Sequence, residues 1–161
     1  MSEVSILLGG NQGDKHKIFF ETRKLISEKI GTIEALSSLY ETEPWGFVSD
    51  LFWNQALTVS STLLPEEVLI RAQDIENKMG RKRLSENYEA RPIDIDLMFY
   101  DDLQINSSFL TIPHPLMAQR RFMLVPLAEI SPEKIHPLTG LTIKEMLGLC
   151  PDKLKVVRII E

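Results

Sequence analysis

The chain has 161 residues, of which 43% are hydrophobic and 25% charged, and its formal net charge is −5 at pH 7. These values exclude a disordered chain and are typical of one folded domain, which we expect to span residues 1–161. The acidic balance disfavours partners such as nucleic acid or an anionic membrane, because a binder of either needs a basic face. Only one cysteine is present, and no apolar run reaches the ~20 residues of a membrane span, so we expect a cytoplasmic protein without disulfides.

The sequence predicts, in chain order, strand, helix, strand, strand, helix and strand over residues 4–8, 15–30, 32–40, 53–61, 65–79 and 93–100. Asp14 and Pro65 favour the two helix starts, and Gly31 and Gly80 favour the two helix ends. The stretch over 81–91 is polar and is expected to be irregular.

This order of elements is typical of the α+β ferredoxin-like (βαββαβ) fold, an antiparallel sheet with helices on one face. The opposite face is then left free for a site. The last third of the chain is expected to be accessory, with short helices near residues 123–128 and 143–149 and an edge strand over 154–160.

The last strand of this unit alternates apolar and acidic residues. Its apolar positions, which should pack against the helices, are Ile93, Ile95, Leu97 and Phe99. Asp94 and Asp96 then project from the open face with their Cα atoms about 6.5–7 Å apart. Mg²⁺ takes one or two carboxylates together with substrate phosphates, and it would relieve the repulsion between these two. A solvated strand face is the alternative, and this motif alone does not decide between them.

Basic side chains are concentrated next to the two carboxylates in the sequence. They are Arg81, Lys82, Arg83 and Arg91, followed later by Arg120 and Arg121. A basic loop that leads into a carboxylate pair favours a polyphosphate ligand over a merely solvated cationic turn. His114, between two prolines, is a further candidate to donate to a phosphate.

A second cluster combines aromatic residues with an amide, namely Trp45, Phe52, Trp53 and Asn54. Such a set suits a flat heteroaromatic ligand that is stacked on rings and hydrogen-bonded at its edge. Aromatic side chains that simply cover the sheet are the stronger alternative on these residues alone.

Taken together, these motifs resemble those of the 6-hydroxymethyl-7,8-dihydropterin pyrophosphokinase family of folate biosynthesis. The resemblance covers essentially the whole chain through residues 8–14, 38–46, 52–54, 73–76, 91–97, 113–115 and 120–127. Arg-Pro-x-Asp-x-Asp-Leu, then Pro-His-Pro and Arg-Arg-Phe, is a highly specific series. It implies a ferredoxin-like enzyme, a diphosphokinase that transfers the β,γ-diphosphate of ATP to the pterin hydroxymethyl group and releases AMP.

By position, the resemblance implies two Mg²⁺ ions on Asp94 and Asp96 and catalytic roles for Arg81, Arg91 and Asp96. The implied ATP-binding residues are Gln73, Glu76, Arg81, Arg83, Tyr88, Arg91, Thr111, His114 and Arg120. The implied pterin-binding residues are Thr42, Glu43, Trp45, Phe52, Asn54 and Phe122. A monomer with ATP and the pterin as its partners is expected.

Two other functions stay open at the level of the sequence. A non-catalytic ferredoxin-like domain that binds a small molecule would make no use of the arginines and carboxylates together. A metal-dependent nuclease is disfavoured by the net charge of −5, because only one loop offers a basic track. The chain also departs from the family pattern at Gly10, Ser49–Leu51, Glu89–Ala90 and Phe109.

Overall fold

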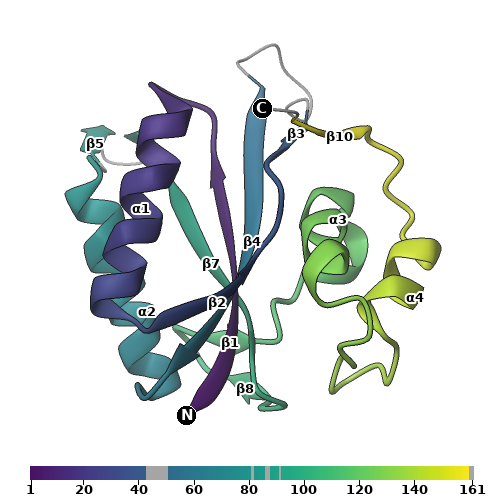
Figure 1. The fold of residues 1–161 in the computed structure, drawn as a ribbon. Helices are drawn as coiled ribbons and strands as arrows, with labels where there is room; N and C mark the ends of the chain where they lie inside the picture. Colours follow the sequence, from purple (N-terminus) through teal and green to yellow (C-terminus); the bar gives the residue numbers. More distant parts are fainter. Residues whose placement is uncertain (43–50, 81, 86–87, 91, 160–161) are drawn as a thin grey trace.

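A computed structural model describes residues 1–42, 51–80, 82–85, 88–90 and 92–159, and its centre is an antiparallel sheet with helices on both sides (Figure 1). The strands of this sheet are β1 (Ser2–Gly10), β2 (Thr32–Leu36), β3 (Tyr40–Thr42), β4 (Phe52–Ser61), β7 (Asp94–Tyr100) and β10 (Val156–Arg158). Their order is β10-β3-β4-β1-β7, and β2 and β3 pair with successive parts of β4. The ferredoxin-like prediction is therefore confirmed.

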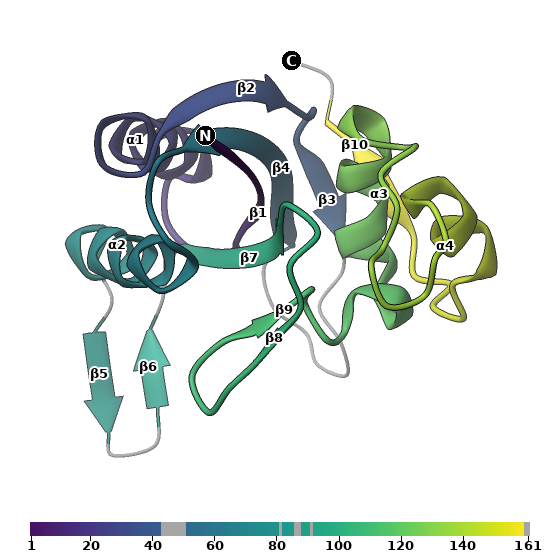
Figure 2. The same ribbon diagram turned by 90° about the horizontal axis from the view of Figure 1, so that it is seen from below.

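The helices form two layers, one on each face of the sheet (Figures 1 and 2). Helices α1 (Lys15–Lys29) and α2 (Pro65–Lys78) cover one face, as expected for the βαββαβ unit. Helices α3 (Arg121–Ile130) and α4 (Ile143–Leu149), from the accessory segment, pack on the opposite face. That face is therefore covered over much of its area and is not simply open, so a site on it must lie where α3 meets the sheet.

Smaller elements lie around this framework. They are the hairpin β5 (Lys82–Ser85) and β6 (Tyr88–Ala90), the hairpin β8 (Ile105–Asn106) and β9 (Thr111–Ile112), and the 3₁₀ turn η1 (Met117–Gln119). The predicted irregular stretch over 81–91 thus contains a hairpin, which projects beside α2 in Figure 2. No helix in the described part of the chain is both long enough and apolar enough to cross a membrane.

The protein has a hydrophobic core on each face of the sheet, because successive side chains of a strand point to opposite faces. On β1, Val4, Ile6 and Leu8 are buried against α1 and α2, whereas Leu7 is buried against α3 and α4. The same period of two separates the neighbouring side chains of β4. Because both faces are packed, a one-residue shift of any central strand would exchange its two sets of side chains.

The expected alternation in β7 is correct up to Leu97 and wrong at Phe99. The pairing of β1 with β7 shifts between Ser5 and Ile6, so that Met98 is an extra residue in β7. A β-bulge of this kind reverses the facing of all later side chains. Phe99 therefore packs with Met98 in the core under α3 and α4, and Tyr100 takes its place in the core under α1 and α2.

The single strand predicted over 32–40 is interrupted at Ser37. Its N–H donates to the carbonyl of Ala56 (2.9 Å), while its hydroxyl accepts from the N–H of Ala56 (2.9 Å). A side-chain oxygen thus replaces a backbone carbonyl of the ladder, which ends β2 and lets β3 begin at Tyr40. The predicted edge strand over 154–160 is shorter in the structure, where β10 covers Val156–Arg158.

The far end of α3 is attached to β3 by Glu129. Its carboxylate accepts hydrogen bonds from the Ser38 N–H (3.0 Å), the Ser38 hydroxyl (3.2 Å) and the Tyr40 hydroxyl (2.5 Å). Burial, followed by the hydrogen bond and the negative charge of Glu129, raises the pKa of Tyr40 to about 12. The phenol therefore remains a donor over the whole physiological range of pH.

The first strand, predicted over residues 4–8, is longer in the structure, where Gly9 and Gly10 are the last residues of β1. A Cβ on Gly10 would lie 2.4 Å from the carbonyl oxygen of Pro92, and a Cβ on Gly9 would lie 2.9 Å from Nδ2 of Asn54. Glycine is required here because two pieces of the protein approach the backbone closely.

We expect Gly10→Ala to destabilise the fold by about 1–3 kcal/mol, because the new methyl group would push the backbone of Pro92 away from β1. Urea unfolding would measure the change. Gly148→Ala is the matched control, since its Cβ would meet nothing within 4 Å in α4, and it should be neutral or stabilising by up to about 1 kcal/mol. Equal stability of the two variants would contradict this prediction.

Candidate active site

A cavity of about 530 Å³ lies between the end of the sheet and the start of α3, within the range of ~300–1,000 Å³ that is usual for small-molecule sites. Its lining residues are Gly9, Thr42, Phe52, Asn54, Asp94, Asp96, Leu116, Gln119, Arg120, Phe122 and Met123. Seven of the residues that the sequence reasoning singled out are therefore brought together: Thr42, Phe52, Asn54, Asp94, Asp96, Arg120 and Phe122.

Asp94 and Asp96 are half-buried on β7 and project from the face opposite α1 and α2, as their alternation with Ile93 and Ile95 predicts. Asp94 lies opposite Gly9 in the β1–β7 pairing. Because Gly9 has no side chain, the cavity continues past it to the first carboxylate.

Glu76 fixes β7 from behind the two aspartates. This buried residue of α2 accepts a hydrogen bond from the N–H of Ile95 (2.8 Å). Ile95 lies between Asp94 and Asp96, so this hydrogen bond ties α2 to the part of β7 that carries both carboxylates. Glu76 is not among the residues that line the cavity in the described part of the chain.

The carboxylate pair fits a magnesium ion that a substrate helps to hold. Among the described residues, no group of three or more His, Cys, Asp or Glu side chains is placed to hold a metal ion. Mg²⁺ does not need such a group, since it commonly takes one or two carboxylates and completes its shell with phosphate oxygens and water. Two aspartates at the wall of an open cavity match that donor set.

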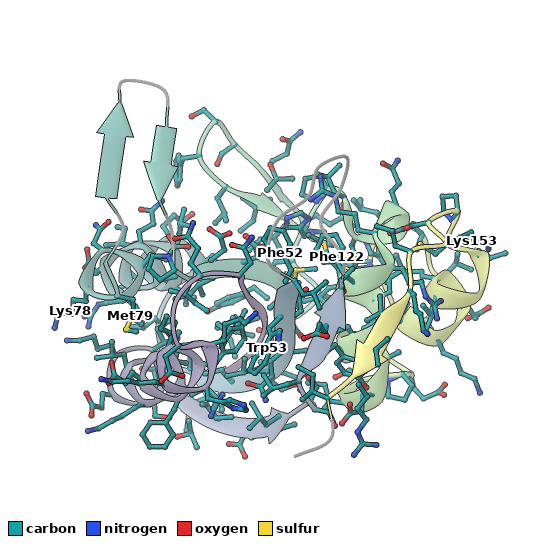
Figure 3. All side chains as sticks on the ribbon, turned by 90° about the horizontal axis from the view of Figure 1, so that it is seen from above. Phe52, Trp53, Lys78, Met79, Phe122 and Lys153 are labelled. Atoms are coloured by element: carbon teal, nitrogen blue, oxygen red, sulfur yellow. The ribbon has the colours of Figure 1, made fainter. Side chains whose placement is uncertain are left out.

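Two phenylalanines approach the cavity from different elements. Phe52 is the first residue of β4 and Phe122 lies in the first turn of α3, and both are half-buried (Figure 3). Trp53 points to the other face of β4, where it packs against Phe19 and the exposed His16 of α1. The ring pair in the cavity is therefore Phe52 with Phe122, and Trp53 belongs to the core.

Two buried polar side chains lie beside this ring pair. Nδ2 of Asn54 donates to the carbonyl of Leu8 (3.2 Å), which fixes the plane of the amide. The hydroxyl of Thr42 is buried and has no hydrogen-bond partner among the described residues. An unsatisfied buried hydroxyl costs about 1–3 kcal/mol, so this atom suits a ligand that brings a polar edge.

A histidine and an arginine, His114 and Arg120, lie on either side of η1. The Arg120 guanidinium carbon lies 5.8 Å from the centre of the Phe122 ring, so this arginine reaches the same cavity as the ring. Nδ1 of His114 accepts from the N–H of Leu116 (3.2 Å). Burial, and to a smaller extent the charge of Arg120, lowers the pKa of His114 below its ordinary value.

The other predicted site residues are not part of the cavity wall that the structure describes. Gln73 is exposed on α2, Thr111 is half-buried on β9, and His114 is half-buried just before η1. Arg83 and Tyr88 belong to β5 and β6, of which only the backbone is described. Glu43, Trp45, Arg81 and Arg91 lie outside the described residues.

Four lining residues were not predicted, namely Gly9, Leu116, Gln119 and Met123. Gly9 lies beyond the predicted first strand over residues 4–8, and only the register of β1 with β7 places it beside Asp94. Leu116 and Gln119 lie in or next to the short η1 turn, whose position depends on packing. Met123 directly follows Phe122, and this position next to a predicted site residue is the one feature of the sequence that could have indicated it.

Comparisons with known proteins agree with this arrangement. The sequence profile of the 7,8-dihydro-6-hydroxymethylpterin-pyrophosphokinase (HPPK) family matches residues 5–132. A 2-amino-4-hydroxy-6-hydroxymethyldihydropteridine pyrophosphokinase from Porphyromonas gingivalis is 38% identical over 141 residues, which cover 85% of this chain and 95% of that protein. The enzyme of the same name from Aquifex aeolicus is 36% identical over 146 residues and covers 90% of each chain.

A solved structure supports the fold independently. The HPPK-DHPS protein of Plasmodium falciparum superimposes with a TM-score of 0.79 at 18% identity, over 92% of this chain and 44% of that one. On the sequence profile and the two relatives, the chain belongs to the HPPK family.

The half-buried His114 and the buried His136 predict that the protein becomes less stable in acid. Nδ1 of His136 accepts from the N–H groups of Leu138 (3.2 Å) and Thr139 (3.3 Å), and burial lowers its pKa as it does that of His114. As the pH falls through about 6.5, the unfolded chain takes up protons that the folded chain does not, so the free energy of unfolding decreases.

Asparagine at both positions would keep an acceptor for these N–H groups but would not titrate. We expect the His114→Asn/His136→Asn variant to lose less stability than the parent protein between about pH 7.5 and pH 5. Urea unfolding at a series of pH values would measure this, and the single variants would separate the two contributions. The same slope in parent and double variant would contradict the prediction.

Proposed function

We propose that this protein transfers the β,γ-diphosphate of ATP to the hydroxymethyl group of 6-hydroxymethyl-7,8-dihydropterin and releases AMP, as a step of folate biosynthesis. The observation that carries the proposal is membership of the HPPK family, through relatives that match nearly the full length of both chains. The cavity supports it because its lining combines two aromatic rings and two polar side chains with two carboxylates and an arginine.

In this proposal the pterin ring stacks between Phe52 and Phe122. The Thr42 hydroxyl and the Asn54 amide then meet its polar edge, which would give the buried hydroxyl its missing partner. Glu43 and Trp45, outside the described residues, complete the pterin site. Stacking holds a flat ring in one plane, and the edge groups set its rotation within that plane.

The triphosphate occupies the other end of the cavity. Asp94 and Asp96 would hold the magnesium, for which we propose two ions, and Mg²⁺ bound there would neutralise phosphate charge. Arg120, from the start of α3, lines the same cavity. The further ATP-binding residues of the proposal are Gln73, Glu76, Arg81, Arg83, Tyr88, Arg91, Thr111 and His114.

The reaction then depends on positioning and on charge neutralisation. The stacked ring holds the primary alcohol in line with the β-phosphorus, while Arg81 and Arg91 neutralise charge that develops on the phosphate oxygens. A bond forms from the alcohol oxygen to the β-phosphorus. The bond between the β-phosphorus and the oxygen that links it to the α-phosphate breaks, and AMP leaves with that oxygen. Asp96 is the proposed acceptor of the hydroxyl proton. We further propose a cytoplasmic monomer without a nucleic-acid partner.

The nature of the nucleotide product tests this function. The protein, ATP, Mg²⁺ and freshly reduced pterin should give AMP, whereas a simple kinase would give ADP and a pure binding domain would give no product. Asp94→Asn and Asp96→Asn should each lower kcat by at least about 100-fold, because the loss of one preorganised electrostatic group commonly costs that much.

Asp102→Asn is the matched control, because the Asp102 side chain is 86% exposed and lies after the end of β7. It should keep the activity of the parent protein. Full activity of either Asp94→Asn or Asp96→Asn would contradict the proposed metal site, and ADP as the product would contradict the proposed reaction.

The Thr42 hydroxyl provides a second test with opposite effects on stability and on binding. Thr42→Val keeps the shape of the side chain but removes the buried hydroxyl, which has no hydrogen-bond partner among the described residues, so the unliganded protein should be as stable as the parent or more stable. The same change should raise the KM for the pterin about tenfold, the equivalent of one hydrogen bond of ~1.4 kcal/mol.

Thr42→Ser retains the hydroxyl and should keep the KM for the pterin near that of the parent protein. Steady-state kinetics with each substrate varied, together with thermal unfolding, would measure both effects. An unchanged pterin KM in Thr42→Val would show that the hydroxyl does not bind the pterin.

A further inference from the structure

The first turn of α3 needs an acceptor from elsewhere in the chain. Its N-cap is Arg120, which makes no side-chain capping hydrogen bond in the described structure, and the turn contains no acidic residue. The first N–H groups of any helix lack partners within the helix. Here the N–H of Arg121 donates to Oδ2 of Asp152 (3.0 Å), a residue 31 positions further along the chain.

Asp152 is itself held in place. Its other carboxylate oxygen, Oδ1, accepts from the N–H of Leu154 (2.9 Å), and the residue is only 8% exposed. It follows α4, and α4 packs against α3 through Ile143 and Met146 in the shared core. A buried carboxylate at the N-terminal end of a helix is favoured by the helix dipole, so the contact is stabilising as well as directional.

The residue that Asp152 holds lies between two residues that line the cavity. Arg121 is preceded by Arg120 and followed by Phe122. Arg120 is extended, with φ −127° and ψ 107°, where the chain turns from η1 into α3. The direction in which α3 starts therefore determines where the Phe122 ring and the Arg120 guanidinium lie.

We infer that Asp152 is a positioning residue for the active site: from the C-terminal segment it fixes the start of α3 and so places Phe122 against the pterin ring. This inference rests on the proposed function. It assigns to Asp152 no contact with a substrate. Its effect passes through the peptide of Arg121 to the neighbouring side chains.

A cap that only stabilises the fold would behave differently, and α4 offers a matched control. The hydroxyl of Thr142 accepts from the N–H of Glu145 (3.1 Å), and Glu145 accepts from the N–H of Thr142 (3.1 Å), which is a complete cap on a helix that lines no described part of the cavity. Removing this cap with Thr142→Ala should lower the Tm without moving the start of α3.

The test compares Asp152→Asn, Asp152→Ser and Thr142→Ala with the parent protein. The carboxylate of Asp152 uses a separate oxygen for each N–H group, whereas an amide or a hydroxyl at position 152 has only one acceptor oxygen. Both Asp152 variants should therefore lower the Tm and raise the KM for the pterin about tenfold, with a smaller change in the KM for ATP. Thr142→Ala should lower the Tm and leave the pterin KM within about twofold of the parent value.

A double-mutant cycle with Phe122→Leu identifies the route of the effect. If Asp152 acts through Phe122, then Asp152→Asn should raise the pterin KM clearly less in the Phe122→Leu background than in the parent. The inference would be overturned if the effects of Asp152→Asn and Phe122→Leu on the pterin KM simply multiplied. It would also be overturned if the Asp152 variants lowered the Tm but kept the pterin KM within about twofold of the parent value. Should Asp152→Asn not fold, Asp152→Ser carries the same comparison.

The failure of this inference and the failure of the proposed function give different results. If the parent protein forms AMP and the Asp152 variants keep its pterin KM, the function stands and the inference is wrong. If the parent protein forms no AMP from ATP and the pterin, the proposed function is wrong and the inference is overturned with it.

Discussion

The two-residue alternation of side chains over residues 93–97, before the bulge in β7, is the constraint on which the site depends. Because adjacent side chains of a strand point to opposite faces, Ile93, Ile95 and Leu97 can be buried under α1 and α2 only if Asp94 and Asp96 are directed to the other face. Burial of the apolar set therefore sets the direction of the acidic set. The hydrogen bond from Ile95 to Glu76 holds this register from the side of α2.

The second face of the sheet is completed by a part of the chain that is remote in sequence. The βαββαβ unit supplies the carboxylates, Phe52, Asn54 and Thr42, but the cavity has its second wall only when α3 brings Arg120, Phe122 and Met123. The wall is attached at both ends, by Asp152 at the first turn of α3 and by Glu129 near its last turn. The accessory segment is thus part of the cavity and part of its support.

Periodic patterns were predictable from the sequence, and local exceptions to them were not. The order of strands and helices, with helix starts indicated by Asp14 and Pro65, was sufficient to predict the ferredoxin-like fold. The alternation over residues 93–97 predicted the shared direction of the two aspartates. The bulge at Met98 and the hydrogen bonds that Ser37 makes to Ala56 depend on the neighbouring strand. Glu76 was assigned to ATP from the resemblance, and its bond to Ile95 required three-dimensional information.

The bond between Glu76 and Ile95 also bears on the solubility of the protein. β7 is an edge strand, since its only partner among the described strands is β1. An exposed edge with unpaired N–H groups invites the strand of another molecule and so promotes aggregation. The carboxyl group of Glu76 accepts from the N–H of Ile95 and so pairs one backbone donor of that edge. The carbonyl of Met98 accepts a further bond, from the N–H of His114 (3.1 Å). Two backbone groups of β7 are thus paired outside the ladder with β1, which leaves fewer of them open to the strand of another molecule.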